Sequence, residues 1–128
     1  MTRLAPVLPL LFVLAACGGG GSAGGATSNP AAARGADLYK AKACASCHTV
    51  DGSTLVGPTW KGLYQSEVEL EDGTKVVADD VYLHESILKP SAKTVKGFPA
   101  GLMETVIKPD SLTFEEAQAL VAYIKTLK

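Results

Sequence analysis

Cys44, Cys47 and His48 are the residues whose types and spacing most clearly support chemistry. The two thiols are three positions apart and the imidazole follows the second thiol directly, which is the attachment pattern of a c-type haem. Each thiol adds across one vinyl group of the porphyrin, and the adjacent imidazole then faces the iron from one side. The pattern therefore predicts one covalently attached haem c, with His48 as an axial ligand.

Three other interpretations of the two thiols compete with the haem. A thioredoxin-like redox pair requires a βαβ pattern nearby, and none is visible. A zinc site requires four ligands, and beyond the motif only His84 and Cys17 are available as histidine or cysteine ligands. A structural disulfide would close a very small loop and stabilise the fold little. The haem is favoured over all three.

The second axial ligand decides the function, because an open position permits ligand binding or peroxide chemistry and a closed one favours electron transfer. Met103 is the one methionine left after removal of Met1, and it lies 55 residues after His48 in a loop rich in glycine and proline. We predict that Met103 is this ligand. His84 is the competing candidate, but its place beside Glu85 in a predicted helix favours a surface position.

The N-terminal segment predicts export from the cytoplasm. Arg3 precedes an apolar run from Leu4 to Ala16, which as a helix would span about 20 Å, too short for a hydrocarbon core of about 30 Å. Residues 1–16 are therefore predicted to be a signal peptide. The run ends in Leu14-Ala15-Ala16-Cys17, which resembles the bacterial lipobox and implies cleavage before Cys17 and its lipidation. An ordinary signal peptide with an incidental cysteine is the alternative.

Composition divides the remaining chain into a tether and a domain. Residues 17–33 comprise the lipidated cysteine and a Gly-rich stretch that predicts a flexible tether. Residues 34–128 then form one domain. Without Arg3 the chain has 11 basic and 13 acidic residues, a net charge near −2. This charge does not indicate a nucleic-acid-binding protein. We expect a monomer, anchored by its lipid at the extracytoplasmic face of a bacterial membrane.

Three helices are predicted in the domain that contains the cysteines, His48 and Met103. The first runs through residues 35–43 and delivers the chain to the first cysteine, and another runs from Asp79 to Lys89 and stops before Pro90. The last begins at Thr113, where Thr113 and Glu116 match a capping box. Its apolar stripe comprises Phe114, Ala117, Leu120, Val121, Ile124 and Leu127.

A β-hairpin is predicted between Ser66 and Ala78. Residues 71–73 form a three-residue loop with Gly73 in the left-handed conformation. The resulting register pairs Val68 with Val76, Glu69 with Lys75 and Leu70 with Thr74. A two-residue turn would place apolar side chains opposite charged ones, so the hydrophobic pattern favours the first register. An irregular loop is the alternative.

The chain resembles a small class I cytochrome c over nearly all of residues 35–128. The resemblance rests on residues 44–48, residues 57–63, the Met103 loop and residues 120–124. The hairpin and residues 79–90 are more narrowly similar to the cytochrome c domain fused to subunit II of bacterial caa3-type haem-copper oxidases. The resemblance implies an all-α fold, about three to five helices around one covalent haem, with a short β-hairpin insertion.

The resemblance also implies roles for single residues. The first and last helices are expected to cross with Gly35 and Tyr39 at the contact. The Pro58 carbonyl is expected to accept a hydrogen bond from His48 Nδ1, a contact that orients a ligating imidazole. The chain departs from the pattern in three respects: Glu104 replaces a proline often found after the methionine, the ligand loop is one residue longer, and there is no copper-binding domain or membrane hairpin.

We therefore interpret the protein as a membrane-anchored monohaem electron carrier of a respiratory chain, not an enzyme. A cytochrome bc-type complex upstream and a haem-copper oxidase downstream are the expected partners. The alternative is a gas-sensing or peroxide-reducing haem protein with an open sixth position, for which Met103 would have to be displaced. The sequence argues against it, because a peroxidase requires distal acid–base groups. Trp60 is expected either to contact the haem or to occupy an ordinary core position.

Charged residues near the haem segments suggest how a partner is steered. Lysines that flank these segments could attract an acidic partner surface: Lys42, Lys61, Lys93 and Lys96. An acidic region is expected to lie away from the exposed haem edge: Glu67, Glu69, Glu71, Asp72, Asp79 and Asp80. Ordinary solvated lysines are the alternative.

Overall fold

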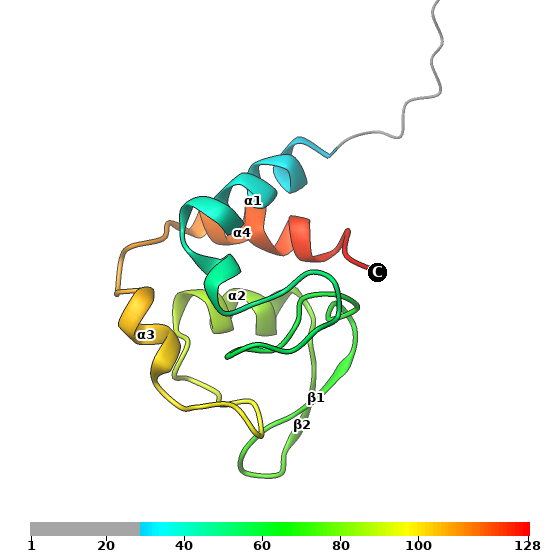
Figure 1. The fold of residues 1–128 in the computed structure, drawn as a ribbon, viewed down its shortest axis with the longest axis vertical. Coiled ribbons are helices and arrows are strands. Elements are labelled where there is room, and N and C mark those ends of the chain that lie inside the picture. The colour runs from blue at the N-terminus through cyan, green and yellow to red at the C-terminus, as the bar shows by residue number, and fades with distance from the viewer. Residues whose placement is uncertain (1–28) are drawn as a thin grey trace, which may run out of the picture.

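The computed structural model describes residues 29–128. The predicted signal peptide, Cys17 and residues 18–28 of the predicted tether lie outside the described residues. The elements in chain order are α1 (Pro30–Ala41), a 3-10 turn η1 (Cys44–Ser46), β1 (Glu67–Glu69), β2 (Lys75–Val77), α2 (Asp80–Leu88), α3 (Leu102–Val106) and α4 (Phe114–Ile124). This mostly helical arrangement with one short hairpin confirms the predicted fold class (Figure 1). No helix within residues 29–128 is long and apolar enough to cross a membrane.

Helix α1 begins earlier than the sequence predicted. The Asn29 side chain caps it by accepting the Ala31 N–H at 3.0 Å, and Pro30 occupies the first position, where a missing N–H is tolerated. Residues 30–33, which composition assigned to the tether, are helical because a cap and three alanines start the helix before Arg34. The helix ends at Ala41, two residues before the predicted end.

Helices α1 and α4 cross closely, as expected (Figure 1). Gly35 makes the crossing possible, because a Cβ at this position would collide with the Ala119 carbonyl and lie 2.7 Å from Tyr123 Cβ. The largest fully buried side chains are on α4: Leu120, Val121 and Ile124. The core extends from this crossing to α2 and the hairpin, where Leu83 and Val68 are buried in the same cluster.

The N-terminus of α4 has the predicted capping box. The Thr113 hydroxyl accepts the Glu116 N–H at 3.1 Å, and the Glu116 carboxylate accepts the Thr113 N–H at 3.0 Å. Phe114 was wrongly assigned to the buried stripe, since 56% of it is exposed. A helical period identifies a face but does not show where the neighbouring elements stop covering it.

The hairpin has the predicted register, with Val68 opposite Val76 and Glu69 opposite Lys75. Gly73 closes the turn with φ +83°. The hairpin also contacts the chain after α2, since Leu70, directly after β1, forms an isolated antiparallel bridge with Val95. This bridge holds residues 94–96 against the hairpin.

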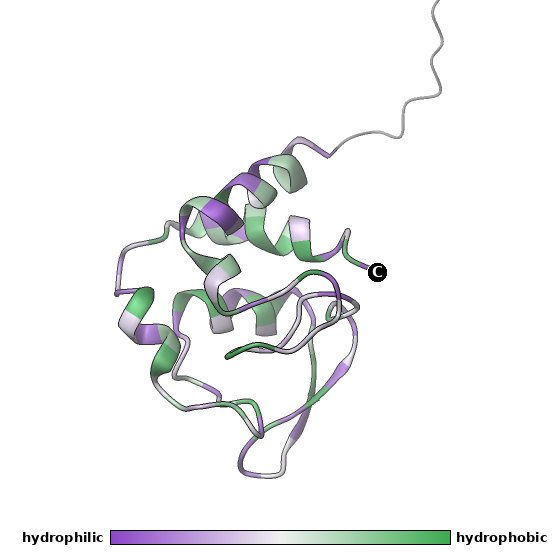
Figure 2. Cartoon of the chain, viewed as in Figure 1, coloured by the Kyte–Doolittle hydropathy of each residue, from purple (hydrophilic) through white to green (hydrophobic). Residues whose placement is uncertain are grey.

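Helix α2 confirms the prediction to within one residue at each end. Asp79 caps it by accepting the Tyr82 N–H at 2.8 Å. The helix buries Tyr82, Leu83 and Ile87. Figure 2 shows hydrophobic residues along much of α2 and α4, and these two helices also contact each other.

Candidate functional site

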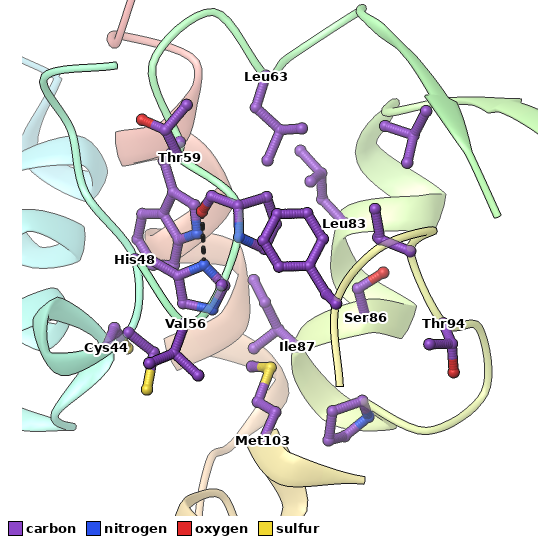
Figure 3. A pocket seen from close by; sticks show the side chains of 18 of the residues that line it. Cys44, His48, Val56, Thr59, Leu63, Leu83, Ser86, Ile87, Thr94 and Met103 are labelled. Atoms are coloured by element: carbon purple, nitrogen blue, oxygen red, sulfur yellow. Dashed lines mark hydrogen bonds between the residues drawn. The ribbon is translucent and has the colours of Figure 1, made fainter. Parts of the chain in front are cut away.

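A cavity of about 560 Å³ is lined by η1, the chain through residues 54–63, β1, α2, residues 90–101 and α3, a usual volume for a cofactor site. All five residues predicted to hold the haem line it: Cys44, Cys47, His48, Pro58 and Met103. In Figure 3, His48 and Met103 lie on opposite sides of the cavity, and the Met103 sulfur points into the space between them. The fold thus assembles these groups from distant parts of the sequence.

The two cysteines are presented by the 3-10 turn η1. Ala43, directly before it, has φ 59°, a left-handed conformation that costs a non-glycine residue about 1–2 kcal/mol. The N–H of Cys47 and that of His48 both bond the Cys44 carbonyl, at 3.2 and 2.9 Å. Both thiols are free, and burial raises the pKa of the Cys44 thiol. The turn therefore offers two unpaired thiols to one cavity.

The competing interpretations of the thiols find no support in residues 29–128. The cysteines form no disulfide. The sheet of this part of the chain is a two-stranded antiparallel hairpin, so the βαβ surroundings of a thioredoxin-like pair are missing. The same residues include no cluster of three or more histidine, cysteine or acidic side chains able to bind a metal ion.

The His48 ring is held by a backbone carbonyl. Its Nδ1 lies 2.8 Å from the Pro58 oxygen, and because a carbonyl only accepts, Nδ1 carries the proton and donates. The lone pair of a neutral ring is then on Nε2, as an iron ligand requires. Burial lowers the pKa of His48, an effect that the Pro58 bond partly opposes. The net direction favours the neutral, ligating imidazole.

Gly57 leaves the space that this ring occupies. A Cβ at Gly57 would lie 2.6 Å from His48 Cε1 and 2.9 Å from Nδ1. The two segments are also paired through the backbone, since the Gly57 N–H bonds the Cys47 carbonyl at 2.9 Å and the Trp60 N–H bonds the Thr49 carbonyl at 2.8 Å. The sequence did not reveal the role of Gly57, because residues 57–63 contributed only to the resemblance to a known family.

Met103 comes from a helix and not from a loop, which corrects the sequence interpretation. It is the second residue of α3, whose N-cap is Gly101 with φ 72°. The helix has five residues and none of them is fully buried. The thioether nevertheless faces the cavity and is partly buried. A single helical turn after a Gly/Pro-rich segment carries no periodicity that the sequence could reveal.

His84 is not among the residues that line the cavity, so the competing bis-His arrangement has no support. Its ring packs on Phe114 with centroids 4.8 Å apart. It is half-buried, and its Nδ1 is a buried atom without a hydrogen-bond partner in the described part of the chain. The prediction of a simple surface residue is therefore only partly right.

Trp60 both lines the cavity and belongs to the core, where it is 4% exposed. Its ring centroid lies 5.4 Å from that of His48 and 5.0 Å from that of Tyr39. The two positions considered for Trp60 are therefore compatible, because this side chain forms the wall behind the imidazole.

The charged rim of the cavity differs from the prediction. Glu67 and Glu69, expected away from the haem edge, line the cavity, because the bridge between Leu70 and Val95 brings the hairpin to the rim. Three of the four lysines are paired with carboxylates: Lys42 with Glu116 at 3.4 Å, Lys96 with Glu69 at 2.6 Å, and Lys93 with Glu85. Within residues 29–128, Lys61 is the member of the four that forms no ion pair.

The chemistry of the cavity fits haem c. Two free thiols lie on one turn, an imidazole with an available Nε2 follows them, and a thioether faces it from the opposite wall. The walls supply apolar contact surface from Leu63, Leu83 and Ile87. Three further apolar side chains are more than a third exposed at this cavity, and a porphyrin would cover them: Val56, Leu102 and Val106.

Comparisons with known proteins agree with this geometry. The cytochrome c family matches residues 32–128. The chain is 34% identical to cytochrome c-551 of Stutzerimonas stutzeri over 94 residues, which cover 73% of this chain and 77% of the relative. It is 31% identical to cytochrome c-551 of Pseudomonas denitrificans over 94 residues, which cover 73% of this chain and 98% of the relative.

Proposed function

The chain belongs to the cytochrome c family and carries one covalently bound haem c, and we propose that Cys44 and Cys47 form the two thioether bonds while His48 and Met103 are the axial ligands. The observation that carries this assignment is the placement of all four side chains around one cavity, with the imidazole and the thioether on opposite walls. Like other members of the family, the protein transfers electrons and is not an enzyme.

The site residues support this role by fixing the coordination in advance. When bound, the haem supplies an iron that cycles between Fe(II) and Fe(III), and His/Met ligation raises its reduction potential. Pro58 and Gly57 hold the imidazole in one orientation. Trp60 and Leu83, both buried, line one side of the cavity with apolar surface. A closed coordination sphere leaves electron transfer as the chemistry of the site.

The attachment is tested by replacing one cysteine at a time in the haem-loaded protein. We expect the Cys44→Ala protein to keep haem through a single thioether, with one vinyl group left unsaturated and a red-shifted pyridine haemochrome band. Cys17→Ala, outside the motif, should leave the wild-type band position. A wild-type protein that releases its haem under denaturing conditions would overturn the covalent assignment.

We also propose that the domain is exported and attached to a membrane. Bacterial c-type cytochromes are extracytoplasmic, and the lipobox-like residues 14–17 after an apolar run support a signal peptide over residues 1–16 and a lipid on Cys17. Gly-rich residues would then link the lipid to the domain, which starts at the Asn29 cap. The test is cell fractionation of the Cys17→Ser protein, which should move from membrane to soluble fraction with its haem content unchanged. A red, membrane-bound Cys17→Ser protein would contradict the anchor.

A cytochrome bc-type complex and a haem-copper oxidase are the proposed donor and acceptor. The support is a resemblance in sequence: the hairpin and residues 79–90 are similar to the cytochrome c domain fused to subunit II of caa3-type oxidases. Electron transfer from the reduced protein to a purified haem-copper oxidase in the same lipid vesicles measures this directly. Turnover that stays at the rate of vesicles without the cytochrome would exclude the oxidase as acceptor.

A further inference from the structure

The Tyr39 hydroxyl makes a contact that neither the haem motif nor the core packing requires. It donates a hydrogen bond to the backbone carbonyl of His48, with an oxygen–oxygen distance of 2.6 Å. Tyr39 is 8% exposed. No backbone N–H of residues 29–128 bonds this carbonyl, so the hydroxyl is its partner in the described part of the chain.

The carbonyls on either side of His48 are bonded to a different element. Those of Cys47 and Thr49 accept from the N–H groups of Gly57 and Trp60. The His48 carbonyl accepts instead from Tyr39, on α1. The backbone at the ligand is therefore fixed from two sides, by the 57–60 segment and by α1.

The position of the Tyr39 hydroxyl is itself set by the helix crossing. The ring centroid of Tyr39 lies 5.8 Å from that of Tyr123 on α4 and 5.0 Å from that of Trp60. One turn earlier in α1, Gly35 has no room for a Cβ against α4. The α1/α4 crossing therefore determines where the hydroxyl meets the His48 carbonyl.

We propose that Tyr39 is a positioning residue for the axial imidazole, and that its hydroxyl couples the α1/α4 crossing to the orientation of His48. The proposal rests on the assignment of His48 as an iron ligand. The hydroxyl proton also offsets the partial negative charge of a carbonyl next to the ligand. Its removal leaves that charge uncompensated, which favours Fe(III) over Fe(II) and lowers the reduction potential.

The test compares haem-loaded Tyr39→Phe with wild type by redox titration and by proton NMR of the haem-ligating histidine. The phenylalanine ring keeps the contacts with Trp60 and Tyr123, so the variant should fold and retain a low-spin spectrum. We expect a lower reduction potential and displaced His48 ring-proton shifts. Tyr123→Phe is the matched control, because its hydroxyl forms no hydrogen bond within residues 29–128, and it should leave both quantities at their wild-type values.

The outcomes separate this inference from the proposed function. If Tyr39→Phe has the wild-type potential and the wild-type histidine shifts, the positioning role is wrong, even if the variant melts at a lower temperature. If Tyr39→Phe and Tyr123→Phe change the potential equally, the effect belongs to the aromatic cluster, and the hydroxyl assignment is overturned. A wild-type protein without low-spin His/Met haem would instead overturn the ligand assignment on which the inference rests.

Discussion

At the scale of the residue, the orientation of His48 depends on a missing side chain as much as on a hydrogen bond. Gly57→Ala would place a Cβ 2.6 Å from His48 Cε1, so the ring or the 57–60 segment must move. Overpacking of this kind costs about 1–3 kcal/mol. We expect denaturant titration of the haem-loaded protein to give a lower free energy of unfolding. We also expect its absorption spectrum to show a weaker far-red band from methionine sulfur bound to ferric iron.

Pro58→Ala is the control for this substitution. The backbone carbonyl at position 58 remains, and with it the acceptor for His48 Nδ1. The far-red band should therefore keep its wild-type intensity. Equal loss of the band in the two variants would show that the segment as a whole, and not the space above the imidazole, controls ligation.

At the scale of the element, the crossing of α1 and α4 depends on Gly35. Alanine is the better helix former by about 1 kcal/mol, yet here its Cβ meets the Ala119 carbonyl. We expect Gly35→Ala to lower the free energy of unfolding by about 1–3 kcal/mol. Ala33→Gly, at an exposed position of the same helix, should cost only about 1 kcal/mol. A Gly35→Ala protein more stable than wild type would contradict the described crossing.

The start of α4 depends on its N-cap, Thr113. Thr113→Ala removes the hydroxyl that accepts the Glu116 N–H, and lost N-caps cost about 1 kcal/mol. The melting temperature of the haem-loaded protein should fall accordingly. Thr113→Ser keeps the acceptor and should retain most of the stability, whereas an equal loss in both variants would show that the capping hydrogen bond is unimportant.

At the scale of the whole molecule, Lys61 is the lysine of the cavity rim that forms no ion pair within residues 29–128, and it is therefore available to an acidic partner. We predict that Lys61→Glu slows electron transfer to the oxidase at an ionic strength of about 0.01 M, where charges act over about 30 Å, and changes it little at about 1 M, where they act over about 3 Å. Lys40→Glu, on α1 outside the cavity, is the matched control. Equal rates in both variants at low salt would contradict steering through Lys61.

The features that the sequence predicted correctly are those set by residues close together in the chain. The hairpin register followed from alternation and one turn glycine, and the capping box placed the start of α4. The early start of α1 was missed because residues 30–33 were read by their similarity to the preceding tether, although Asn29 and Pro30 form a helix start.

Contacts between distant segments could not be predicted in the same way. The bridge from Leu70 to Val95 and the ion pair from Glu69 to Lys96 join residues more than twenty positions apart. Together they carry the acidic hairpin to the cavity rim, where the sequence had placed free lysines. The hydrogen bond from the Tyr39 hydroxyl likewise could not be predicted, because its contact with the His48 carbonyl depends on where helices α1 and α4 cross.

The most direct test of His48/Met103 ligation is the absorption spectrum of the haem-loaded protein, oxidised, reduced, and reduced under carbon monoxide. We predict a low-spin spectrum with the weak far-red band of a ferric haem ligated by methionine sulfur, no change under carbon monoxide, and loss of the band in Met103→Ala. A high-spin ferric haem, or a reduced wild-type protein that binds carbon monoxide readily, would contradict a closed electron-transfer site and indicate an open sixth position.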